Sequence, residues 1–264
     1  MRAKLALYQF HNERTKAHRE HLGHALVLAP DADRFAPGRL DDEIEVAGPV
    51  LRDSSRIDEK MLIVHSGWLE PQEVAMLAKR KPSLVCAPSS SLHNGYGNFV
   101  VGKLPELIAL GVNVAVGSDH ASSGIVDMSQ EMRLACCCYK ETRINPRVMP
   151  PETGIEMATI NGAKAALLDT RIGSIEVGKE ADVVLFDTRR PEWQPLINPV
   201  ANLVYSATGD SVRDVFVAGE QVVAHGTLTK IDESKLYEEI PVAVSRFSKH
   251  LKVDQMVQLK WPVT

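Results

Sequence analysis

The sequence predicts an α/β fold built around a parallel β-sheet. Three apolar runs, MLIVH (61–65), SLVCAP (83–88) and NVAVGSD (113–119), are each followed by a loop and a helix-compatible stretch. Such repeats of strand, loop and helix are typical of βα units whose strands lie parallel to one another. The segments LIV, LVC and VAV are continuously apolar, as expected for parallel strands that are covered on both faces.

The other elements of this first region follow in order along the chain. LALYQF (5–10) predicts a short buried strand, and the polar stretch that follows it predicts a helix ending at Gly23. The segment 30–58 is rich in Pro, Asp and Gly, which predicts an extended loop. Between and after the three apolar runs we expect helices over PQEVAMLAKR (71–80), GKLPELIALG (102–111) and VDMSQEMRLACCCYKE (126–141).

The pattern changes after about residue 172. The segments 173–187, 203–207 and 212–226 are short and β-rich, with Gly at the turns, and GEQVVAHG (219–226) is typical of a hairpin. The stretch 232–250 predicts a helix. We therefore expect three parts: residues 1–172 with the parallel sheet, residues 173–231 with a β-type module, and a helical tail over residues 232–264.

Composition narrows the classes of protein. The net charge is −4, with 44% hydrophobic and 24% charged residues, which is ordinary for a globular domain and gives no reason to expect nucleic acid as a partner. No apolar run approaches the roughly 20 residues that a membrane helix needs, and the first residues do not resemble a signal peptide. Three of the four cysteines are consecutive, 136 to 138, which disfavours a disulfide framework and favours a reducing cytoplasm.

Polar side chains follow each of the predicted strands. His11 follows the first strand, His65 ends the second, Ser90 and His93 follow the third, and Asp119 ends the fourth. In parallel α/β folds the functional groups lie at the C-terminal ends of strands. A single His at such a place is more often a hydrogen-bonded structural residue, but four strand ends with polar groups favour a site.

Imidazole and carboxylate groups suggest metal chemistry. Both bind Zn²⁺ or Fe²⁺, and a bound metal lowers the pKa of water to about 7. A nearby carboxylate can then carry a proton to a leaving nitrogen. Glu13 is a candidate for this role, although its position equally fits a solvated carboxylate that interacts favourably with a helix dipole.

Several blocks together resemble a known family. GVNVAVGSD (111–119), EMRLA (131–135), MATINGAKA (157–165) and the β-rich segments that follow are similar to amidohydrolases of the cytosine-deaminase and triazine-hydrolase group. This resemblance, from about residue 61 to 232, implies the C-terminal portion of a TIM-like (β/α)8 barrel, strands 5 to 8, joined to the C-terminal part of a small β-sandwich.

The resemblance also implies roles for particular residues. In that group a His-x-His pair after strand 1, a His after strand 5 and an Asp after strand 8 hold the metal, and a His after strand 6 contacts the substrate or the attacking water. Asp119 resembles the strand-8 ligand, His65 the strand-6 histidine, and His11 the strand-5 ligand, with Glu13 as its companion carboxylate.

Substrate contacts are expected from the loops beside these residues. Ser122 would line the site behind Asp119, and the segment 89–97, with Ser90 and His93, would form part of the substrate loop. Trp68 follows His65 closely and either stacks on a flat heterocycle or packs at the rim of the site.

The expected function is hydrolysis of a non-peptide C–N bond, by a deaminase or a chlorohydrolase of a nitrogen heterocycle that uses one divalent metal, zinc or iron. The chain departs from the group in two ways: it contains no His-x-His, and His11 and Glu13 are spaced as His-x-Glu. A catalytically silent fragment, a partner-dependent subunit and a small-molecule binding module therefore remain alternatives. Four parallel strands would leave open edges, which predicts a homo-oligomer or pairing with a complementary chain.

Overall fold

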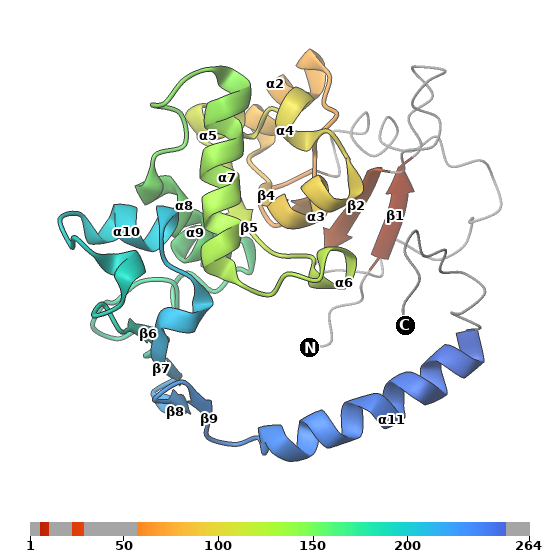
Figure 1. Cartoon of the computed structure of the whole chain (residues 1–264). Helices are drawn as coiled ribbons and strands as arrows, with labels where there is room; N and C mark the ends of the chain where they lie inside the picture. Colours follow the sequence, from red (N-terminus) through yellow and green to blue (C-terminus); the bar gives the residue numbers. More distant parts are fainter. Residues whose placement is uncertain (1–5, 11–22, 29–56, 252–264) are drawn as a thin grey trace.

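Two separate sheets organise the part of the chain that the computed structural model describes, residues 6–10, 23–28 and 57–251. The first sheet has five strands in the order β1-β2-β3-β4-β5, and the second has four in the order β6-β7-β8-β9. In Figure 1 the first sheet lies beside a group of helices, and the second sheet lies below them, followed by the long helix α11. The coarse prediction of an α/β fold with a parallel sheet is confirmed.

The parallel part of the first sheet consists of the three apolar runs. β3 (Leu62–Val64), β4 (Ser83–Cys86) and β5 (Asn113–Val116) are parallel neighbours. Leu84 stands in register with Ile63 on one side and with Val114 on the other, and the exposed fractions of these residues are 0%, 6% and 0%. Side chains that are excluded from water on the central strand hold the sheet together through the hydrophobic effect.

The remaining two strands are antiparallel to their neighbours. β1 (Ala6–Phe10) pairs with β2 (Gly23–Leu28), which pairs in turn with β3. The strand predicted over residues 5–10 is confirmed, whereas β2 was not predicted. Residues 11–22 lie outside the described residues, and Gly23, the expected end of a helix, begins β2 instead. Because β2 is antiparallel to both of its neighbours, β1 runs in the same direction as β3, and both strands end at the same edge.

Helices cover the parallel strands. The longest of them, α7 (Met128–Arg143), buries Met132, Ala135, Cys136 and Tyr139, which are spaced three or four residues apart and so lie on one face. Cys137 points away and is exposed. The other helices of this part are α2 (Pro71–Arg80), α3 (Pro88–Asn94), α4 (Asn98–Val101), α5 (Leu104–Ala109), α6 (His120–Ser123), α8 (Pro151–Ala158) and α9 (Ile160–Ala165).

Two expectations about local structure are wrong. The segment 203–207 is not β-rich: residues Pro199–Tyr205 form helix α10, because the Asn198 side chain accepts hydrogen bonds from the amides of Val200 and Ala201, and Pro199 suits the first helical position. The segment 89–97 is not wholly a loop, since its first residues continue the helix α3 that begins at Pro88.

The second sheet is antiparallel. It contains β6 (Val183–Phe186), β7 (Val212–Val217), β8 (Glu220–Ala224) and β9 (Thr227–Leu228). The hairpin predicted at residues 219–226 is confirmed only in part: these residues hold one strand, β8, which forms hairpins with β7 and with β9. The turns 218–219 and 225–226 join them, and their residues all have φ between 49° and 81°. Two-residue turns with positive φ match the twist of paired strands.

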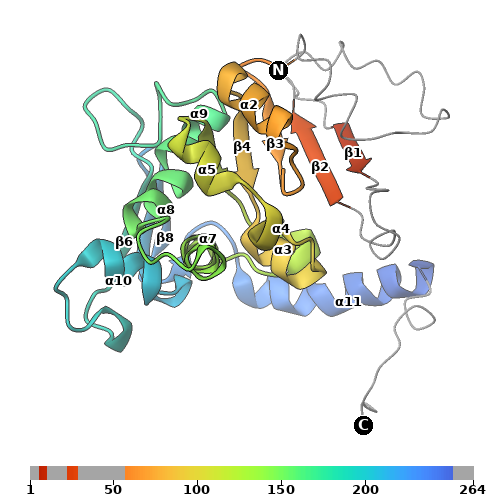
Figure 2. The same ribbon diagram turned by 90° about the horizontal axis from the view of Figure 1, so that it is seen from above.

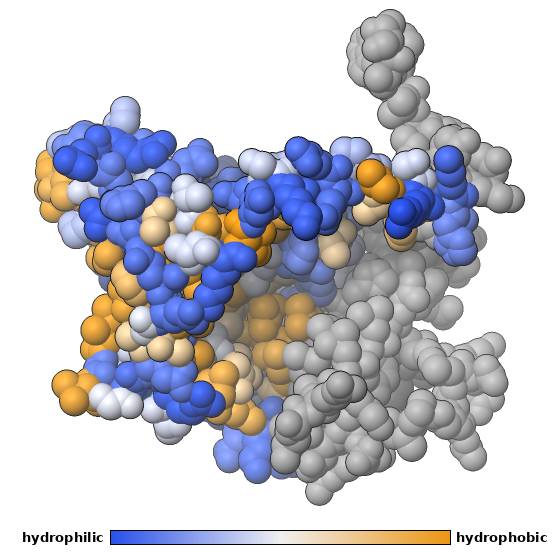
Figure 3. All heavy atoms as spheres, turned by 90° about the horizontal axis from the view of Figure 1, so that it is seen from below, coloured by the Kyte–Doolittle hydropathy of each residue, from blue (hydrophilic) through white to orange (hydrophobic). Residues whose placement is uncertain are grey.

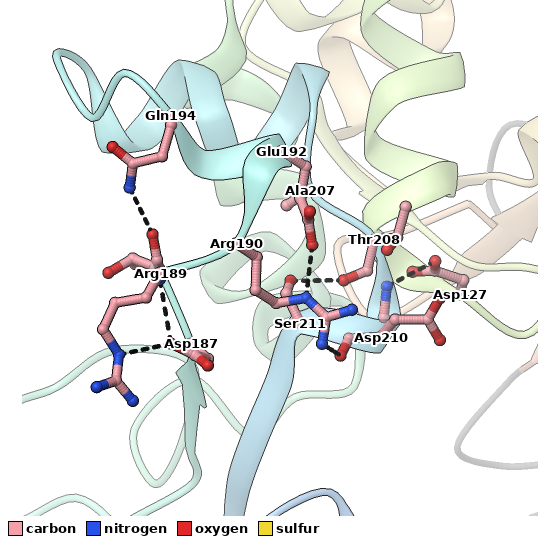
Figure 4. Close-up of polar contacts among 12 residues, drawn as sticks. Asp127, Asp187, Arg189, Arg190, Glu192, Gln194, Ala207, Thr208, Asp210 and Ser211 are labelled. Atoms are coloured by element: carbon pink, nitrogen blue, oxygen red, sulfur yellow. Dashed lines mark hydrogen bonds and ion pairs between the residues drawn. The ribbon is translucent and has the colours of Figure 1, made fainter.

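A polar junction joins the second sheet to helix α7. Asp127 Oδ2 accepts a hydrogen bond from the Gly209 amide at 2.9 Å, and the Arg133 side chain donates one to the Ala207 carbonyl at 2.7 Å. On the other side of this loop, Arg190 donates to the Asp210 carbonyl at 2.8 Å (Figure 4). Backbone groups of the segment 207–210 are therefore held from both directions.

The tail helix α11 (Glu233–Leu251) leads away from the second sheet in both ribbon views (Figures 1 and 2), and in Figure 1 it passes below the first sheet. Tyr237 and Phe247 on this helix are 68% and 62% exposed. Apolar atoms also reach the surface elsewhere, alternating with polar ones on the face shown in Figure 3. Among the described residues, no helix has the length and apolar character needed to cross a membrane.

Candidate active site

Three parallel strands bring their C-terminal ends to one edge of the sheet, and the predicted residues His65, Ser90 and Asp119 meet there. His65 directly follows β3, Ser90 lies in the first turn of α3 after β4, and Asp119 lies three residues beyond β5. The His65 Nε2 atom is 3.7 Å from Asp119 Oδ2. The same carboxylate oxygen accepts a hydrogen bond from Ser90 Oγ at 2.7 Å.

The backbone at two of these residues is unusual. His65 has φ 73° and Asp119 has φ 46°, both in the left-handed region that residues other than glycine rarely occupy. The His65 amide donates a hydrogen bond to the Val85 carbonyl on the neighbouring strand at 2.9 Å, which fixes the chain as it leaves β3. Such conformations cost about 1–3 kcal/mol each and occur often at functional sites. Here they turn the two side chains toward each other.

Burial differs between the members of this group. Ser90 has no exposed surface and His65 is 8% exposed, whereas 38% of the Asp119 side chain is accessible. Asn94, one turn later in α3, donates a hydrogen bond to the Ser90 carbonyl at 2.9 Å. The carboxylate is therefore supported from the protein side and open on the other side.

An aromatic wall stands next to His65. The Trp68 indole nitrogen donates a hydrogen bond to the Tyr96 carbonyl at 2.7 Å, and the Tyr96 ring meets the His65 imidazole edge-on with 5.5 Å between centroids. Gly97 has φ 76°, and a Cβ there would lie 3.2 Å from the Trp68 ring. The indole is thus held in one orientation, yet 46% of Trp68 is exposed. A flat, accessible surface of this kind suits a planar ring.

The other predicted site residues are not gathered by described contacts. His93 lies on α3 and is exposed. Ser122 lies in α6, next to the loop that carries Asp119, and its side chain is not among the described ones. His11 and Glu13 lie outside the described residues. The roles of all four remain predictions.

No functional role was predicted for Glu131, which the structure places behind the site. This residue of α7 is fully buried, and its carboxylate contacts the amide and the hydroxyl of Ser89. Burial raises the pKa of Glu131, the two hydrogen bonds from Ser89 oppose this, and the nearby Asp127 adds to the rise. In the sequence, Glu131 could be noticed only as the first residue of the EMRLA block and as a carboxylate four residues after Asp127.

The donor atoms at the sheet edge are of the types that bind a divalent metal. Carboxylate oxygen and imidazole nitrogen are ligands for zinc and iron, and Asp119 and His65 bring one of each to the site. Within the described part of the chain, no three His, Cys, Asp or Glu residues lie close enough together to hold a metal ion. The described residues thus fit part of a metal site.

Curated relatives of this chain are deaminases. The chain is 38% identical over 185 residues to the 5-methylthioadenosine/S-adenosylhomocysteine deaminase of Moorella thermoacetica, which covers 70% of this chain and 42% of that protein. It is 33% identical over 230 residues to the 5'-deoxyadenosine deaminase of Methanosarcina acetivorans, covering 86% of this chain and 52% of that protein. The chain therefore spans only about half of the length of each of these relatives.

Solved structures with the same arrangement include a zinc-bound adenosine deaminase from Xanthomonas campestris. That structure has a TM-score of 0.68 and 31% identity and covers 73% of this chain and 44% of its own. The zinc-bound atrazine chlorohydrolase of Arthrobacter aurescens has a TM-score of 0.61 at 18% identity, covering 69% of this chain and 40% of its own, and shows the fold alone.

The model of one protein family matches most of the chain. It is described as the amidohydrolase family and covers residues 9–222, which include β2 to β5, the end of β1 and the His65–Ser90–Asp119 group. Members of this family are typically metal-dependent, in keeping with the donor types found here. With the family match, the fold and the residues at the sheet edge in agreement, this chain belongs to the amidohydrolase family.

Proposed function

We propose that this chain supplies part of the active site of a metal-dependent hydrolase that removes an amino group from a nitrogen heterocycle, with purine nucleosides as the substrate class. The contact of Asp119 with His65 and Ser90, in a chain of the amidohydrolase family, is the observation that carries this proposal. The relatives named as deaminases of adenosine derivatives favour deamination over dechlorination.

One divalent metal, zinc or iron, would be held by Asp119 together with His11. The carboxylate has the right chemistry, and its accessible surface leaves room for a ligand on the solvent side. When bound there, the metal would supply a water molecule that loses a proton near neutral pH. The remaining steps belong to the side chains of the protein.

In the proposed reaction, water adds to the ring carbon that carries the amino group, the C–N bond breaks, and the nitrogen leaves as ammonia. Asp119 accepts a proton from the attacking water, and Glu13 carries a proton to the leaving nitrogen. His65 orients the water or the substrate through Nε2, the imidazole atom that faces Asp119. The leaving nitrogen thus gains one of the two protons of the water that is consumed, and the other is taken up by the ring nitrogen next to the new carbonyl group.

Binding of the heterocycle would use the surface around this group. The exposed indole of Trp68, fixed by its hydrogen bond to the Tyr96 carbonyl, offers a stacking face beside His65. His93 and Ser122 extend the proposed binding surface on the two neighbouring loops. A planar base would then lie with its amino group near Asp119.

The test combines metal content with ammonia release. We expect the purified chain, reconstituted with zinc or iron, to bind about one metal ion per chain or per dimer and to release ammonia from adenosine, 5'-deoxyadenosine or 5-methylthioadenosine. Asp119→Ala should abolish this release. Unchanged turnover in Asp119→Ala would overturn the assignment of Asp119.

A second function is favoured by the missing His-x-His pair. A partner-dependent subunit or a catalytically silent fragment would retain Asp119 and His65 and yet lack the ligands for tight metal binding. This second function predicts that the chain holds no metal after reconstitution with zinc or iron. Ammonia release that appears only on adding a chain with a His-x-His would identify the partner-dependent form.

The finer assignments are also proposals. We place the chain in the cytosine-deaminase and triazine-hydrolase group, as the C-terminal portion of a (β/α)8 barrel with part of a β-sandwich, and expect a homo-oligomer or pairing with a complementary chain. A cytoplasmic location is supported by the cysteines, because all four are free thiols.

A further inference from the structure

The fully buried carboxylate of Glu131 has no part in the proposed reaction and so requires a separate explanation. Ionisable side chains are seldom fully buried unless they are paired, because transfer of a charged group out of water is costly. Both oxygens of Glu131 face one residue: the Ser89 amide donates to Oε2 at 3.0 Å, and the Ser89 hydroxyl donates to Oε1. The carboxylate therefore fixes the backbone and the side chain of Ser89 together.

Ser89 is a junction between two loops. Its hydroxyl lies 2.9 Å from Ser123 Oγ and 3.3 Å from the Ser118 carbonyl oxygen. Ser123 Oγ is also 3.2 Å from the Ser118 carbonyl oxygen, so its single proton can be donated either to Ser89 Oγ or to that carbonyl. The segment after β4 is thereby tied to the segment after β5, directly behind the site.

Each of these anchored residues immediately precedes a member of the site. Ser90 follows Ser89 and donates its hydroxyl proton to Asp119, and Asp119 follows Ser118. Since Ser90 has no exposed surface, the donor of this hydrogen bond is buried, while its acceptor keeps one side open to solvent. A shift of Ser89 would move the donor, and a shift of Ser118 would move the acceptor.

We propose that Glu131 is a positioning residue, which holds Ser89 so that Ser90 fixes the Asp119 carboxylate in a single orientation for its ligand. Ser90 then acts through Asp119, rather than by touching the substrate as its sequence position suggested. This inference rests on the proposed function, in which Asp119 is a metal ligand. Groups that hold a metal-binding side chain in place typically contribute 10–100-fold to metal affinity.

The test compares zinc affinity among variants, measured by competition with a chromophoric chelator at a temperature where circular dichroism shows each variant to be folded. We expect Glu131→Leu and Ser90→Ala each to weaken zinc binding by about 10–100-fold. Glu131→Gln keeps one oxygen to accept from the Ser89 amide, and should recover most of the affinity.

Glu106→Gln is the matched control. Glu106 is paired with Arg143 at 2.8 Å, between helices α5 and α7, and takes no part in the site. Loss of this pair should lower stability without changing zinc affinity. If Glu131→Leu and Ser90→Ala bind zinc as tightly as the unmodified chain, the positioning role is wrong.

A second measurement needs no metal. In the metal-free chain, hydrogen exchange followed by mass spectrometry should become faster in peptides covering residues 117–124 in Glu131→Leu, and stay unchanged in Glu106→Gln. Unchanged exchange in Glu131→Leu would overturn the proposal even where no zinc binds. Two other outcomes would contradict the proposed function: an unmodified chain that takes up no zinc, or an Asp119→Ala variant that still binds zinc. In either case the hydrogen-exchange result would decide the role of Glu131.

Discussion

Asp119 combines an unfavourable backbone conformation with a carboxylate that is accessible to solvent. Its φ of 46° is tolerated by Asp and Asn better than by most other residues, because their short polar side chains fit the left-handed region. The side chain is drawn toward the protein by Ser90 and remains open toward solvent. These constraints agree with the chemical role proposed for Asp119.

Asp119→Asn separates the two properties. Asn suits the same φ and can still accept the hydrogen bond from Ser90, so we expect the free energy of unfolding to change by no more than about 0.5 kcal/mol. Loss of the negative charge should remove metal binding and ammonia release. Urea unfolding checks the expected stability, and a zinc-competition assay checks the expected loss of metal binding. A variant that stays fully active would contradict the role of Asp119.

Asp127 is a second carboxylate with a clear physical task. It caps helix α7 by accepting from the Ser129 amide at 2.8 Å, and it also accepts from the Gly209 amide. Burial raises the pKa of Asp127, but these backbone hydrogen bonds outweigh that effect, and the net pKa lies below the ordinary value of 3.8. The ionised form is therefore the one that stabilises the fold.

We expect Asp127→Ala to lower the free energy of unfolding at pH 7 by about 1 kcal/mol, the usual contribution of an N-cap. A depressed pKa means that this contribution is present above pH 3.8 and is lost as the pH falls through the lowered value. Urea unfolding at pH 7 and near pH 3 should therefore show a smaller difference between the two proteins in acid. Asp127→Asn is the control, since it caps without a charge and should show little pH dependence of its own.

At the scale of elements, close contact between helices α7 and α8 depends on one glycine. A Cβ on Gly154 would lie 2.9 Å from Cys136 Sγ, with Val204 and Met132 at 3.5 and 3.6 Å. These neighbours are buried, and there is little room for them to move. The absence of a side chain at Gly154 is what allows α8 to approach α7 and α10.

Gly154→Ala should destabilise the chain by about 1–3 kcal/mol, because overpacking exceeds the gain in helix propensity. Adding Cys136→Ala makes room for the new methyl group, so the double variant should be more stable than the sum of the single effects predicts. Gly162→Ala in α9 is the matched control: its nearest neighbour would be 3.7 Å away, and we expect a gain of up to about 1 kcal/mol. Thermal or urea unfolding of the four variants checks this, and strict additivity would contradict the proposed clash.

Elements were predictable from sequence where the local pattern determined them. The apolar runs predicted β3, β4 and β5, because parallel strands covered on both faces leave few polar residues. β2 was missed, although ALVL is apolar, since the polar residues before it favoured a helix. α10 was missed because Leu203, Val204 and Tyr205 suit a strand, while the Asn-Pro pair that begins the helix received no weight.

The candidate site was predictable only in part, for a related reason. His65 and Asp119 could be found because strand ends of one sheet meet at one edge, a rule that depends on topology alone. The contact of Glu131 with Ser89 joins residues 42 positions apart across a helix and a loop, and no local pattern encodes it. Long-range hydrogen bonds of this kind require the packed structure.

At the scale of the whole molecule, stability is concentrated in the first sheet and its helices. The buried core includes Leu84, Leu107 and Tyr139, whereas most residues of α11 are exposed. The tail helix therefore contributes little burial within the described chain. Substitutions in the two regions should differ accordingly.

Leu84→Ala, in the central parallel strand, should lower the free energy of unfolding by about 2–5 kcal/mol, since it removes buried methyl groups and leaves a cavity. Tyr237→Ala in α11 should change it by no more than about 0.5 kcal/mol. Urea unfolding of both variants at one protein concentration tests the contrast. A large effect of Tyr237→Ala would show instead that α11 packs against another surface in solution.

The order of the parallel strands has a consequence for how the site can change. β4 lies between β3 and β5, so the segment after β4 borders both of the others, while the segments after β3 and β5 each border only one. Sequence changes after β4 would therefore disturb the whole edge at once, through Ser89 and Ser90. Changes around Trp68, after β3, would alter one side and leave the Ser90–Asp119 contact intact. In terms of the proposed function, a change of substrate preference is therefore expected to arise at the flank of the site, while its middle stays constant.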